Sequence, residues 1–499
     1  MSDKRSSYRQ IMKTTSIFGG VQFFQIIINI VRSKFIAVLL GPGGMGIAGL
    51  LTSTTGFIAA LTNFGLSTSA VKNVSAAYSS GNSRRLSVVV TVFRRWVWIT
   101  GILGALATAI FSPWLSQITF GSKEYTFAFI WISITLLLNQ ISAGQGVILR
   151  GTRQIAYLAK SGVIGSIIGL CTTVPLYYFF GKDGIVPAII ISSVTALVLT
   201  WYFSRKVGIQ QVYVSKARTV AEGKEMLTMG FMISLSSLIT LGASYVVRIF
   251  ISRTGGVDQV GLYNAGFAIV NTYVGMIFTA MSTDYYPRLS AVSEDNKQSR
   301  NTINQQAEIA VLILAPILII FLVFIKWIII LFYSNMFIGA SDMIYWATLG
   351  IFFKAVSWSV AFIFLAKGAT KLFFWNELIT NIYMLVLNIG GYYLFGLTGL
   401  GLSFFLVYLI YAFQVYFVAK AKYDFIFTKE LLKIFIIQFG LAFLSFVVVR
   451  YVHNDLYYYF LGGIIIVVST LSSFVELDKR LNVKSIVSDR VKSLWRRKN

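Results

Sequence analysis

The sequence has very few of the residues that usually build metal and catalytic sites. Its 499 residues include one cysteine, Cys171, and one histidine, His453. A single cysteine excludes a disulfide within the chain, and its place in an apolar run indicates a packing role. One histidine in a short loop gives no basis for a histidine metal site or a histidine base. We therefore expect no metal and no cofactor.

Charged residues are also scarce, and acidic ones are the scarcer kind. Only 12% of the residues are charged, with 18 Asp and Glu against 43 Lys and Arg, so the net charge is +25. Hydrophobic residues make up 56% of the chain. Apolar runs of about 20 residues recur along its whole length, which is enough for a helix to cross a bilayer. The composition predicts an all-α integral membrane protein.

The basic residues alternate with the apolar runs instead of forming one patch, which argues against nucleic-acid binding. Fourteen spans are predicted, at about 17–40, 47–70, 92–112, 126–149, 157–180, 185–203, 227–250, 262–285, 307–330, 343–366, 372–394, 399–419, 432–450 and 457–475. One set of connecting segments holds 34 of the Lys and Arg residues, and the other set holds four. By the positive-inside rule, both termini are predicted to be cytoplasmic.

An internal repeat organises these spans. Arg248 follows Arg32 by 216 residues, and Gly261 follows Gly46 by 215, each pair at a matching point where one apolar helix ends and the next begins. Because both copies run in the same direction, the repeats are parallel. We predict an N-lobe at 1–215 and a C-lobe at 216–425, each of six helices, around a central cleft. Helices 13 and 14 follow at 426–475.

The tail at 476–499 carries eight basic residues and apolar residues at helical spacing. This pattern predicts an amphipathic cytoplasmic helix along the inner membrane surface. A solvated basic tail is the alternative.

Several cations lie within the spans, where a charge costs at least ~2.5–3.5 kcal/mol unless it faces a cavity. Lys354 lies near the middle of its span, which favours a functional role. Arg32 and Arg248 lie nearer the outer ends and could snorkel outward, but their matched places in the repeat favour function. Lys34 points about 200° away from Arg32 around the helix. Lys326 is interpreted as an interfacial anchor.

Buried acids are fewer than buried cations. Asp284, Glu308 and Glu377 all lie within about two turns of the inner ends of their spans. Glu377 lies deepest and could pair with a buried base, carry a coupling ion or form an inner-face salt bridge. An excess of positive charge in a cleft indicates an anionic substrate, and Arg and Lys both suit phosphate.

Five short motifs, in this order and spacing, resemble the bacterial polysaccharide flippases of the Wzx type, in particular the O-antigen and enterobacterial-common-antigen translocases. They are Gly41-Pro42 with Gly44 and Gly46, Phe120-Gly121 ahead of Tyr125, Leu149-Arg150-Gly151-Thr152-Arg153, Ser334-Asn335-Met336-Phe337 followed by Asp342, and Gly350-Ile351-Phe352-Phe353-Lys354 followed by Ala366-Lys367. That family belongs to the multidrug/oligosaccharidyl-lipid/polysaccharide exporter superfamily. The similarity runs over roughly residues 10–420.

The resemblance implies a flippase of the bacterial inner membrane that moves undecaprenyl-diphosphate-linked oligosaccharide to the periplasmic leaflet by alternating access. It implies that Lys34, Arg248 and Lys354 bind the diphosphate, with Arg150 near the cytoplasmic mouth; the repeat adds Arg32. Glu377 is the candidate for ion coupling. Lipid-linked glycan, the bilayer and glycan-assembly proteins would be the partners.

Two other function classes remain as alternatives. A cation-coupled multidrug antiporter of the same fold would need a deep acidic residue, and the first six spans have none. A membrane polymerase or glycosyltransferase would need a sizeable segment between spans, an acidic metal-binding pair or a catalytic histidine. The sequence lacks these features, so we do not expect an enzyme.

Overall fold

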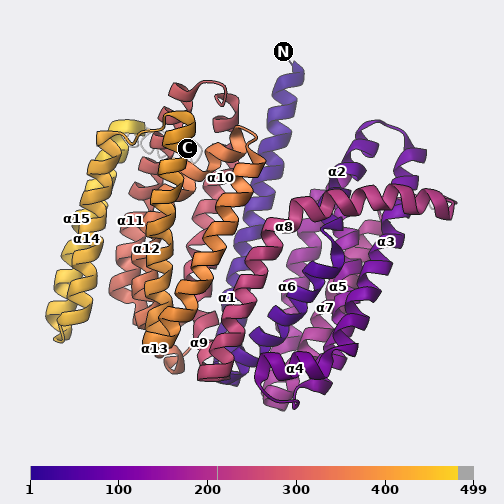
Figure 1. Cartoon of the computed structure of the whole chain (residues 1–499), viewed down its shortest axis with the longest axis horizontal. Coiled ribbons are helices and arrows are strands. Elements are labelled where there is room, and N and C mark those ends of the chain that lie inside the picture. Colours follow the sequence, from indigo (N-terminus) through magenta and orange to yellow (C-terminus); the bar gives the residue numbers. More distant parts are fainter. Residues whose placement is uncertain (1, 211, 482–499) are drawn as a thin grey trace, which may run out of the picture. The chain divides into compact units, whose positions relative to one another are not determined.

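The computed structural model describes residues 2–210 and 212–481, and within these ranges the chain is helical and contains no β-strand (Figure 1). Eleven segments of the described chain are long and apolar enough to cross a membrane. The predicted all-α membrane fold is therefore confirmed, whereas the orientation of the termini stays a prediction. Of the predicted tail helix, residues 482–499 lie outside the described residues.

The chain forms two compact units, which are described separately. Unit 1 comprises Met1–Asn264 and Leu331–Met336, and unit 2 comprises Ala265–Ile330 and Phe337–Asn499. The helices of unit 1 are α1 (Ser2–Asn63), α2 (Leu66–Ser79), α3 (Ser83–Ile110), α4 (Ser112–Phe120), α5 (Thr126–Gly151), α6 (Ile155–Phe180), η1 (Gly181–Gly184), α7 (Ile185–Arg205) and α8 (Lys216–Gly255). Helix α9 (Val257–Phe267) runs across the division. Unit 2 contains η2 (Ala268–Tyr273, a π-helical stretch), α10 (Gly275–Ala291), α11 (Asn296–Phe332), η3 (Asn335–Ala340), α12 (Ser341–Ala366), α13 (Thr370–Tyr423), α14 (Lys429–Tyr451) and α15 (Asp455–Leu481).

Three of the eleven segments contain a break and are long enough for two crossings each. Helix α1 breaks at Gly41, α13 breaks at Gly396, and η1 separates α6 from α7. Both glycines have positive φ, which a residue with a Cβ adopts only under strain. The count of fourteen spans stays a prediction.

The internal repeat appears in the backbone with a constant offset of 215 residues. Helix α5 begins at Thr126 and ends at Gly151, and α12 begins and ends 215 residues later. Gly41 and Gly256 have φ of 63° and 84°, with ψ of −171° and 172°. Gly181 and Gly396 match in the same way, with φ of 55° and 59°. The parallel repeat inferred from Arg32 and Arg248 is therefore confirmed in the helix boundaries and in the breaks.

One predicted span is wrong in detail. Residues 47–70 do not form one helix, because the chain breaks at Phe64 and Gly65, which have φ of 50° and 63°. A Cβ on Gly65 would lie 2.1 Å from the carbonyl oxygen of Gly230 in α8, so the break accompanies a close backbone approach. Apolar periodicity continues through this point, and the sequence gives only the glycine as a signal.

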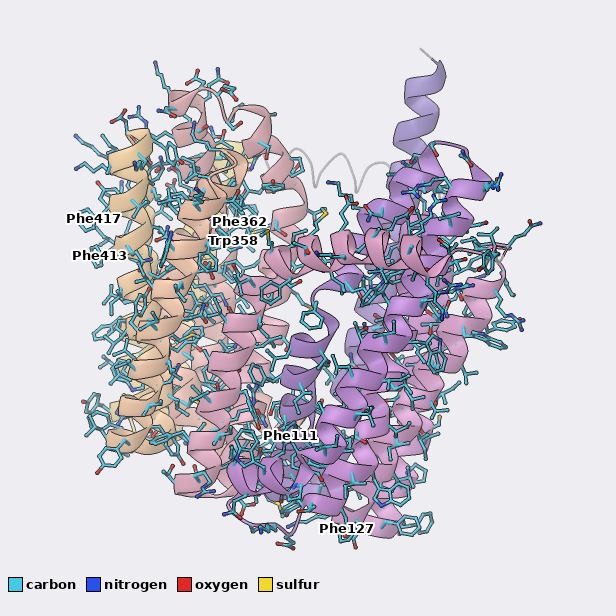
Figure 2. All side chains as sticks on the ribbon, turned by 45° about the vertical axis from the view of Figure 1, so that its right-hand side comes forward. Phe111, Phe127, Trp358, Phe362, Phe413 and Phe417 are labelled. Atoms are coloured by element: carbon cyan, nitrogen blue, oxygen red, sulfur yellow. The ribbon has the colours of Figure 1, made fainter. Side chains whose placement is uncertain are left out.

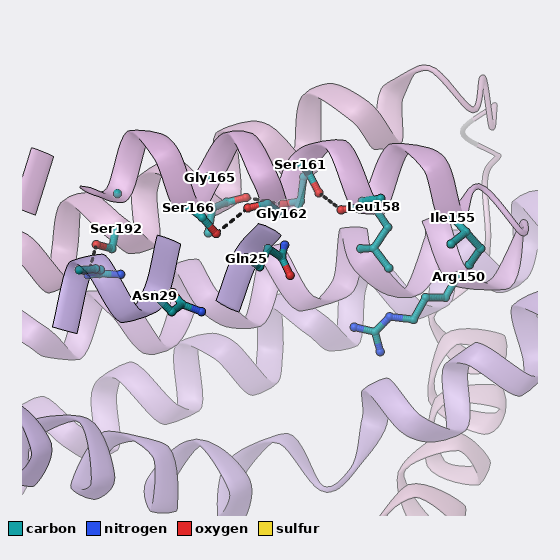
Figure 3. A pocket seen from close by; sticks show the side chains of 15 residues that line it. Gln25, Asn29, Arg150, Ile155, Leu158, Ser161, Gly162, Gly165, Ser166 and Ser192 are labelled. Atoms are coloured by element: carbon teal, nitrogen blue, oxygen red, sulfur yellow. Dashed lines mark hydrogen bonds between the residues drawn. The ribbon is translucent and has the colours of Figure 1, made fainter. Parts of the chain in front are cut away.

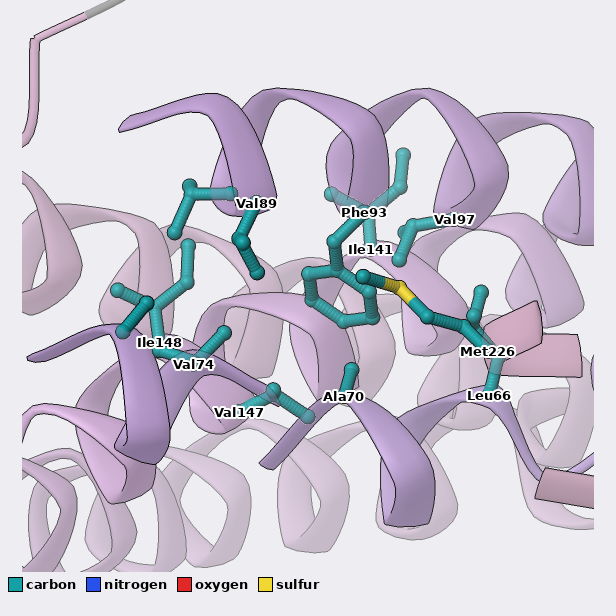
Figure 4. Close-up of a cluster of buried hydrophobic side chains, with 12 residues drawn as sticks. Leu66, Ala70, Val74, Val89, Phe93, Val97, Ile141, Val147, Ile148 and Met226 are labelled. Atoms are coloured by element: carbon teal, nitrogen blue, oxygen red, sulfur yellow. The ribbon is translucent and has the colours of Figure 1, made fainter. Parts of the chain in front are cut away.

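A buried apolar cluster holds α2, α3, α5 and α8 of unit 1 together (Figure 4). Phe93 lies within it, fully buried, with Leu66, Ile148 and Met226 among its other members. Truncating a buried Phe to Ala typically costs about 3–5 kcal/mol, so this cluster fixes the inner structure of the unit.

Aromatic side chains also lie on the outside of each unit. Phe111 and Phe127 are 56% and 73% exposed and lie toward the same end of unit 1 (Figure 2). In unit 2, Phe413 and Phe417 are exposed, whereas Trp358 and Phe362 pack in an aromatic cluster with Tyr285. Exposed aromatic and aliphatic side chains on long helices are expected where the solvent is lipid.

Candidate functional site

The predicted site residues divide between the two units. Arg32, Lys34, Arg150 and Arg248 belong to unit 1, and Lys354 belongs to unit 2 with Glu377. Each group is described within its own unit.

Unit 1 contains a polar cavity of about 770 Å³ that brings Arg32 and Arg150 together (Figure 3). It lies among α1, α6, α7 and the end of α5. Figure 3 shows Arg150 at one end and Ser192, to which Arg32 donates a hydrogen bond, at the other. Most other polar lining residues carry a hydroxyl or an amide: Gln25, Asn29, Ser161, Ser166 and Thr200. Among the described residues, no carboxylate lines this cavity.

The Arg32 side chain is half-buried and incompletely paired. Its Nη2 atom lies 3.5 Å from the Ser192 hydroxyl, a long hydrogen bond, and its buried Nε has no partner in the described structure. An unpaired buried donor costs about 1–3 kcal/mol, and more when charged. The guanidinium therefore keeps donors free for an anionic ligand.

Small residues make the space. Gly162, Gly165 and Gly169 line the cavity from one side of α6, and a Cβ on Gly162 would lie 2.2 Å from the Gln25 side chain. The repeat shows what larger residues would do. The residues 215 positions after Gly162 and Ala196 are Glu377 and Tyr411, and in unit 2 these two side chains are hydrogen-bonded to each other. The cavity of unit 1 thus lies where unit 2 is filled.

Arg150 lies in the last turn of α5 and is exposed. Three residues later, Arg153 has a φ of 59°, and its repeat partner Gly368 has a φ of 67°. A tight turn therefore follows Arg150, whose side chain lines the mouth of the cavity.

Lys34 and Arg248 do not line this cavity. Lys34 follows Arg32 by two residues and lies on another face of α1, in agreement with the helical spacing. The Nε atom of Arg248 donates to the Asn264 side chain at 3.0 Å, and Nη1 donates to the carbonyl and hydroxyl of Ser244. The Tyr263 ring lies 5.5 Å from its guanidinium carbon. Neutral groups therefore hold the Arg248 charge.

Lys354 lies in the middle of α12, as predicted, and is surrounded by aromatic rings. Its Nζ atom donates to the Asn271 side chain at 3.3 Å. The ring centres of Phe278, Phe404 and Tyr408 lie 5.6, 5.7 and 5.1 Å from Nζ. Ring faces attract a cation, and no described carboxylate lies within ion-pair distance. Asn271 belongs to the π-helical stretch η2, a feature often found at functional sites.

Glu377 accepts a hydrogen bond from the Tyr411 hydroxyl at 3.1 Å and forms no ion pair with a described residue. Of the interpretations left open by the sequence, the inner-face salt bridge is not observed. The other two acids do form ion pairs. Glu308 pairs with Arg480 at 2.8 Å, and Asp284 pairs with Arg288 at 3.8 Å.

Sequence reasoning missed the polar lining of the cavity and the rings around Lys354. The first had a signal, because Gln25, Asn29 and Arg32 are spaced by four and three residues and so share a helix face. The second had none, since Phe278 and Phe404 come from helices far from Lys354 in the sequence.

Comparisons with known proteins agree with the resemblance inferred from the motifs. A family described as "Polysaccharide biosynthesis protein" matches residues 35–342. The chain is 22% identical over 357 residues to the Lipid III flippase of Escherichia coli (strain K12), covering 69% of this chain and 82% of the relative. It is 23% identical over 333 residues to a putative O-antigen transporter of Shigella flexneri, covering 65% and 77%.

Solved structures show the same fold. The Lipid II flippase MurJ in an inward closed conformation matches with a TM-score of 0.70 and 15% identity, over 93% of this chain and 99% of MurJ. An inward-facing MATE multidrug resistance transporter of the MOP superfamily matches with a TM-score of 0.64 and 15% identity, over 80% and 94%.

Proposed function

Because this chain belongs to the polysaccharide biosynthesis protein family, we propose that it is a flippase for undecaprenyl-diphosphate-linked oligosaccharide, an O-antigen or related glycan repeat unit. The proposal takes its direction from the relatives named Lipid III flippase and putative O-antigen transporter. It places the protein in a bacterial inner membrane with both termini in the cytoplasm. The lipid-linked glycan moves from the cytoplasmic to the periplasmic leaflet by alternating access, without chemical change.

The observation that carries the proposal is the cavity of unit 1. It presents two guanidinium groups, Arg32 and Arg150, and among the described residues no carboxylate lines it. A guanidinium matches phosphate oxygens with two parallel N–H donors. The hydroxyl and amide groups between the two arginines suit a polar ligand, so the diphosphate and the first sugar are the proposed occupants.

The remaining proposed diphosphate residues are Lys34, Arg248 and Lys354. Arg248 and Lys354 are held by amides, hydroxyls and rings instead of carboxylates. A carboxylate partner would have to be displaced before a phosphate could bind, whereas neutral partners leave the charge available. Glu377, bonded to a phenol, is the proposed site of ion coupling.

The multidrug antiporter is the second candidate, because a MATE transporter shares the fold. Binding of organic cations would require acidic groups in the binding cavity. The cavity of unit 1 instead presents arginines, which favours an anionic substrate.

The test is glycan assembly in cells that depend on this gene. Arg32→Gln and Arg150→Gln should abolish or strongly reduce surface glycan, with membrane levels of the protein unchanged. Lys123→Gln, which removes an exposed charge outside the cavity, is the matched control and should behave as wild type. Normal glycan export by both arginine variants would contradict the proposed site. Resistance to cationic drugs without any effect on glycan would favour the antiporter.

A further inference from the structure

Unit 2 contains a second polar cavity, of about 440 Å³, that the proposed transport does not use. It lies where the end of α11 and the beginning of α12 meet the end of α14 and the beginning of α15. The start of α15 is fixed there, because the Tyr458 hydroxyl donates to the carbonyl of Val323 at 2.6 Å and Trp327 donates to the Tyr459 hydroxyl at 2.6 Å. The cavity exists because α14 and α15 pack on this end of α11 and α12.

Two cations and one acid line this cavity. Arg450 lies 3.6 Å from Asp342, which is too long for a good hydrogen bond and leaves the guanidinium donors largely unused. Lys326 also lines the cavity and forms no ion pair with a described residue. The lining therefore carries an excess of positive charge.

A buried hydroxyl adds to the donors. Tyr345 is 6% exposed and lines the cavity, and its hydroxyl makes no hydrogen bond of normal geometry, although Tyr458 lies beside it. A buried phenol usually finds a partner. A ligand with acceptor oxygens in this cavity would supply one.

The repeat shows that this polarity is not a property of the scaffold position. The residues 215 positions earlier in unit 1 are Phe111, Phe127 and Ile130, and all three are exposed apolar side chains (Figure 2). Unit 2 has Lys326, Asp342 and Tyr345 at these positions. The same helix face thus has a lipid-facing surface in unit 1 and charged groups under α14 and α15 in unit 2. Lys326, interpreted from the sequence as an interfacial anchor, belongs to this group.

We propose that this cavity binds the phosphate of a membrane phospholipid headgroup, through Lys326, Arg450 and the Tyr345 hydroxyl. Its volume equals about 15 water molecules at ~30 Å³ each, which is enough for a phosphate and its glycerol. The predicted topology places it in the outer leaflet. None of its residues belongs to the proposed diphosphate site, so the two proposals can fail separately.

The test measures lipid binding to the delipidated full-length protein in detergent, by native mass spectrometry. Three probes are compared: phosphatidylglycerol, a diacylglycerol with the same acyl chains, and inorganic phosphate. Phosphatidylglycerol should bind more tightly than diacylglycerol. Lys326→Gln should weaken this binding about tenfold or more, because a hydrogen bond to a charged group is lost. Tyr345→Phe should weaken it less and keep the packing of the ring.

Lys123→Gln is the matched control, since it removes one exposed charge elsewhere and should leave binding unchanged. Lys326→Phe, which installs the residue found at position 111, should abolish the preference for phosphatidylglycerol. If inorganic phosphate binds as tightly as the lipid and depends on Lys326 equally, the phosphate chemistry is upheld and a soluble source replaces the headgroup. Equal phosphatidylglycerol binding by the wild type and Lys326→Gln would overturn the proposal.

Discussion

Gly46 and Gly261 make reciprocal contacts across two helices that are copies of each other. A Cβ on Gly46 would lie 1.9 Å from the carbonyl oxygen of Val257, and a Cβ on Gly261 would lie 1.9 Å from the carbonyl oxygen of Pro42. Both pairs of equivalent residues, 42 with 257 and 46 with 261, are separated by the repeat offset of 215. Such reciprocity is typical of a two-fold relation between like surfaces.

This contact predicts that neither glycine tolerates a side chain. Gly46→Ala places a methyl group against backbone that cannot rotate away, and overpacking of this kind costs about 1–3 kcal/mol. The melting temperature of the purified protein should fall. Gly440→Ala is the matched control, since a Cβ there meets no atom within 4 Å. An equal effect of the two substitutions would show that helix propensity, and not the contact, controls the result.

Filling the cavity of unit 1 should block binding without unfolding the protein. Ala196→Tyr installs the residue that unit 2 has at the equivalent position, Tyr411, and its ring would occupy space next to Arg32. We expect binding of undecaprenyl diphosphate to be lost while the protein elutes as a folded species on size exclusion. Ala196→Ser, which adds only a hydroxyl, should bind normally. Unchanged binding by Ala196→Tyr would place the diphosphate elsewhere.

Lys354 should be needed for transport but not for stability. Lys354→Met keeps the length of the side chain and removes a charge that no described carboxylate compensates. Thermal stability should therefore be equal or higher, because the apolar group needs no partner. Glycan export should be lost, and Lys354→Arg should retain part of it. A large loss of stability in Lys354→Met would instead assign the ammonium a structural role among Phe278, Phe404 and Tyr408.

Glu377 provides the test of ion coupling. Glu377→Gln keeps a group that can bond to Tyr411 but cannot exchange a proton or bind a cation by charge. In proteoliposomes, the variant should lose the dependence of flipping on an imposed ion gradient and keep slow downhill flipping. Gradient dependence equal to that of the wild type would remove Glu377 from the coupling mechanism.

Much of the fold could be predicted from the sequence, since long apolar runs leave few alternatives in a bilayer. The break at Gly41 and Pro42 followed from the chemistry of those two residues, and the repeat followed from the matched arginines and glycines. The break at Phe64 and Gly65 did not, because it depends on the approach of Gly230 from α8. Local pattern does not specify such tertiary contacts.

The candidate site could be predicted only as a set of charges. The rule that buried charge indicates function selected Arg32, Arg248 and Lys354. It could not predict that Arg32 and Arg150 would line one cavity, or that neutral groups would hold Arg248. It also could not predict that Lys326 would share a cavity with Arg450, because helices 13 and 14 supply that wall. These relations arise from packing between helices that are distant in the sequence.

The central claim is that the protein recognises a polyprenyl lipid by its diphosphate, and thermal unfolding of the purified protein tests it most directly. Any ligand that binds only the folded state raises the melting temperature, and at 100 times its Kd it adds about 2.7 kcal/mol of stability. Undecaprenyl diphosphate should raise the melting temperature of the wild type, and undecaprenol, with the same chain and no phosphate, should not. The shift should be much smaller in Arg32→Gln. Equal shifts with both lipids, or an undiminished shift in Arg32→Gln, would contradict the account.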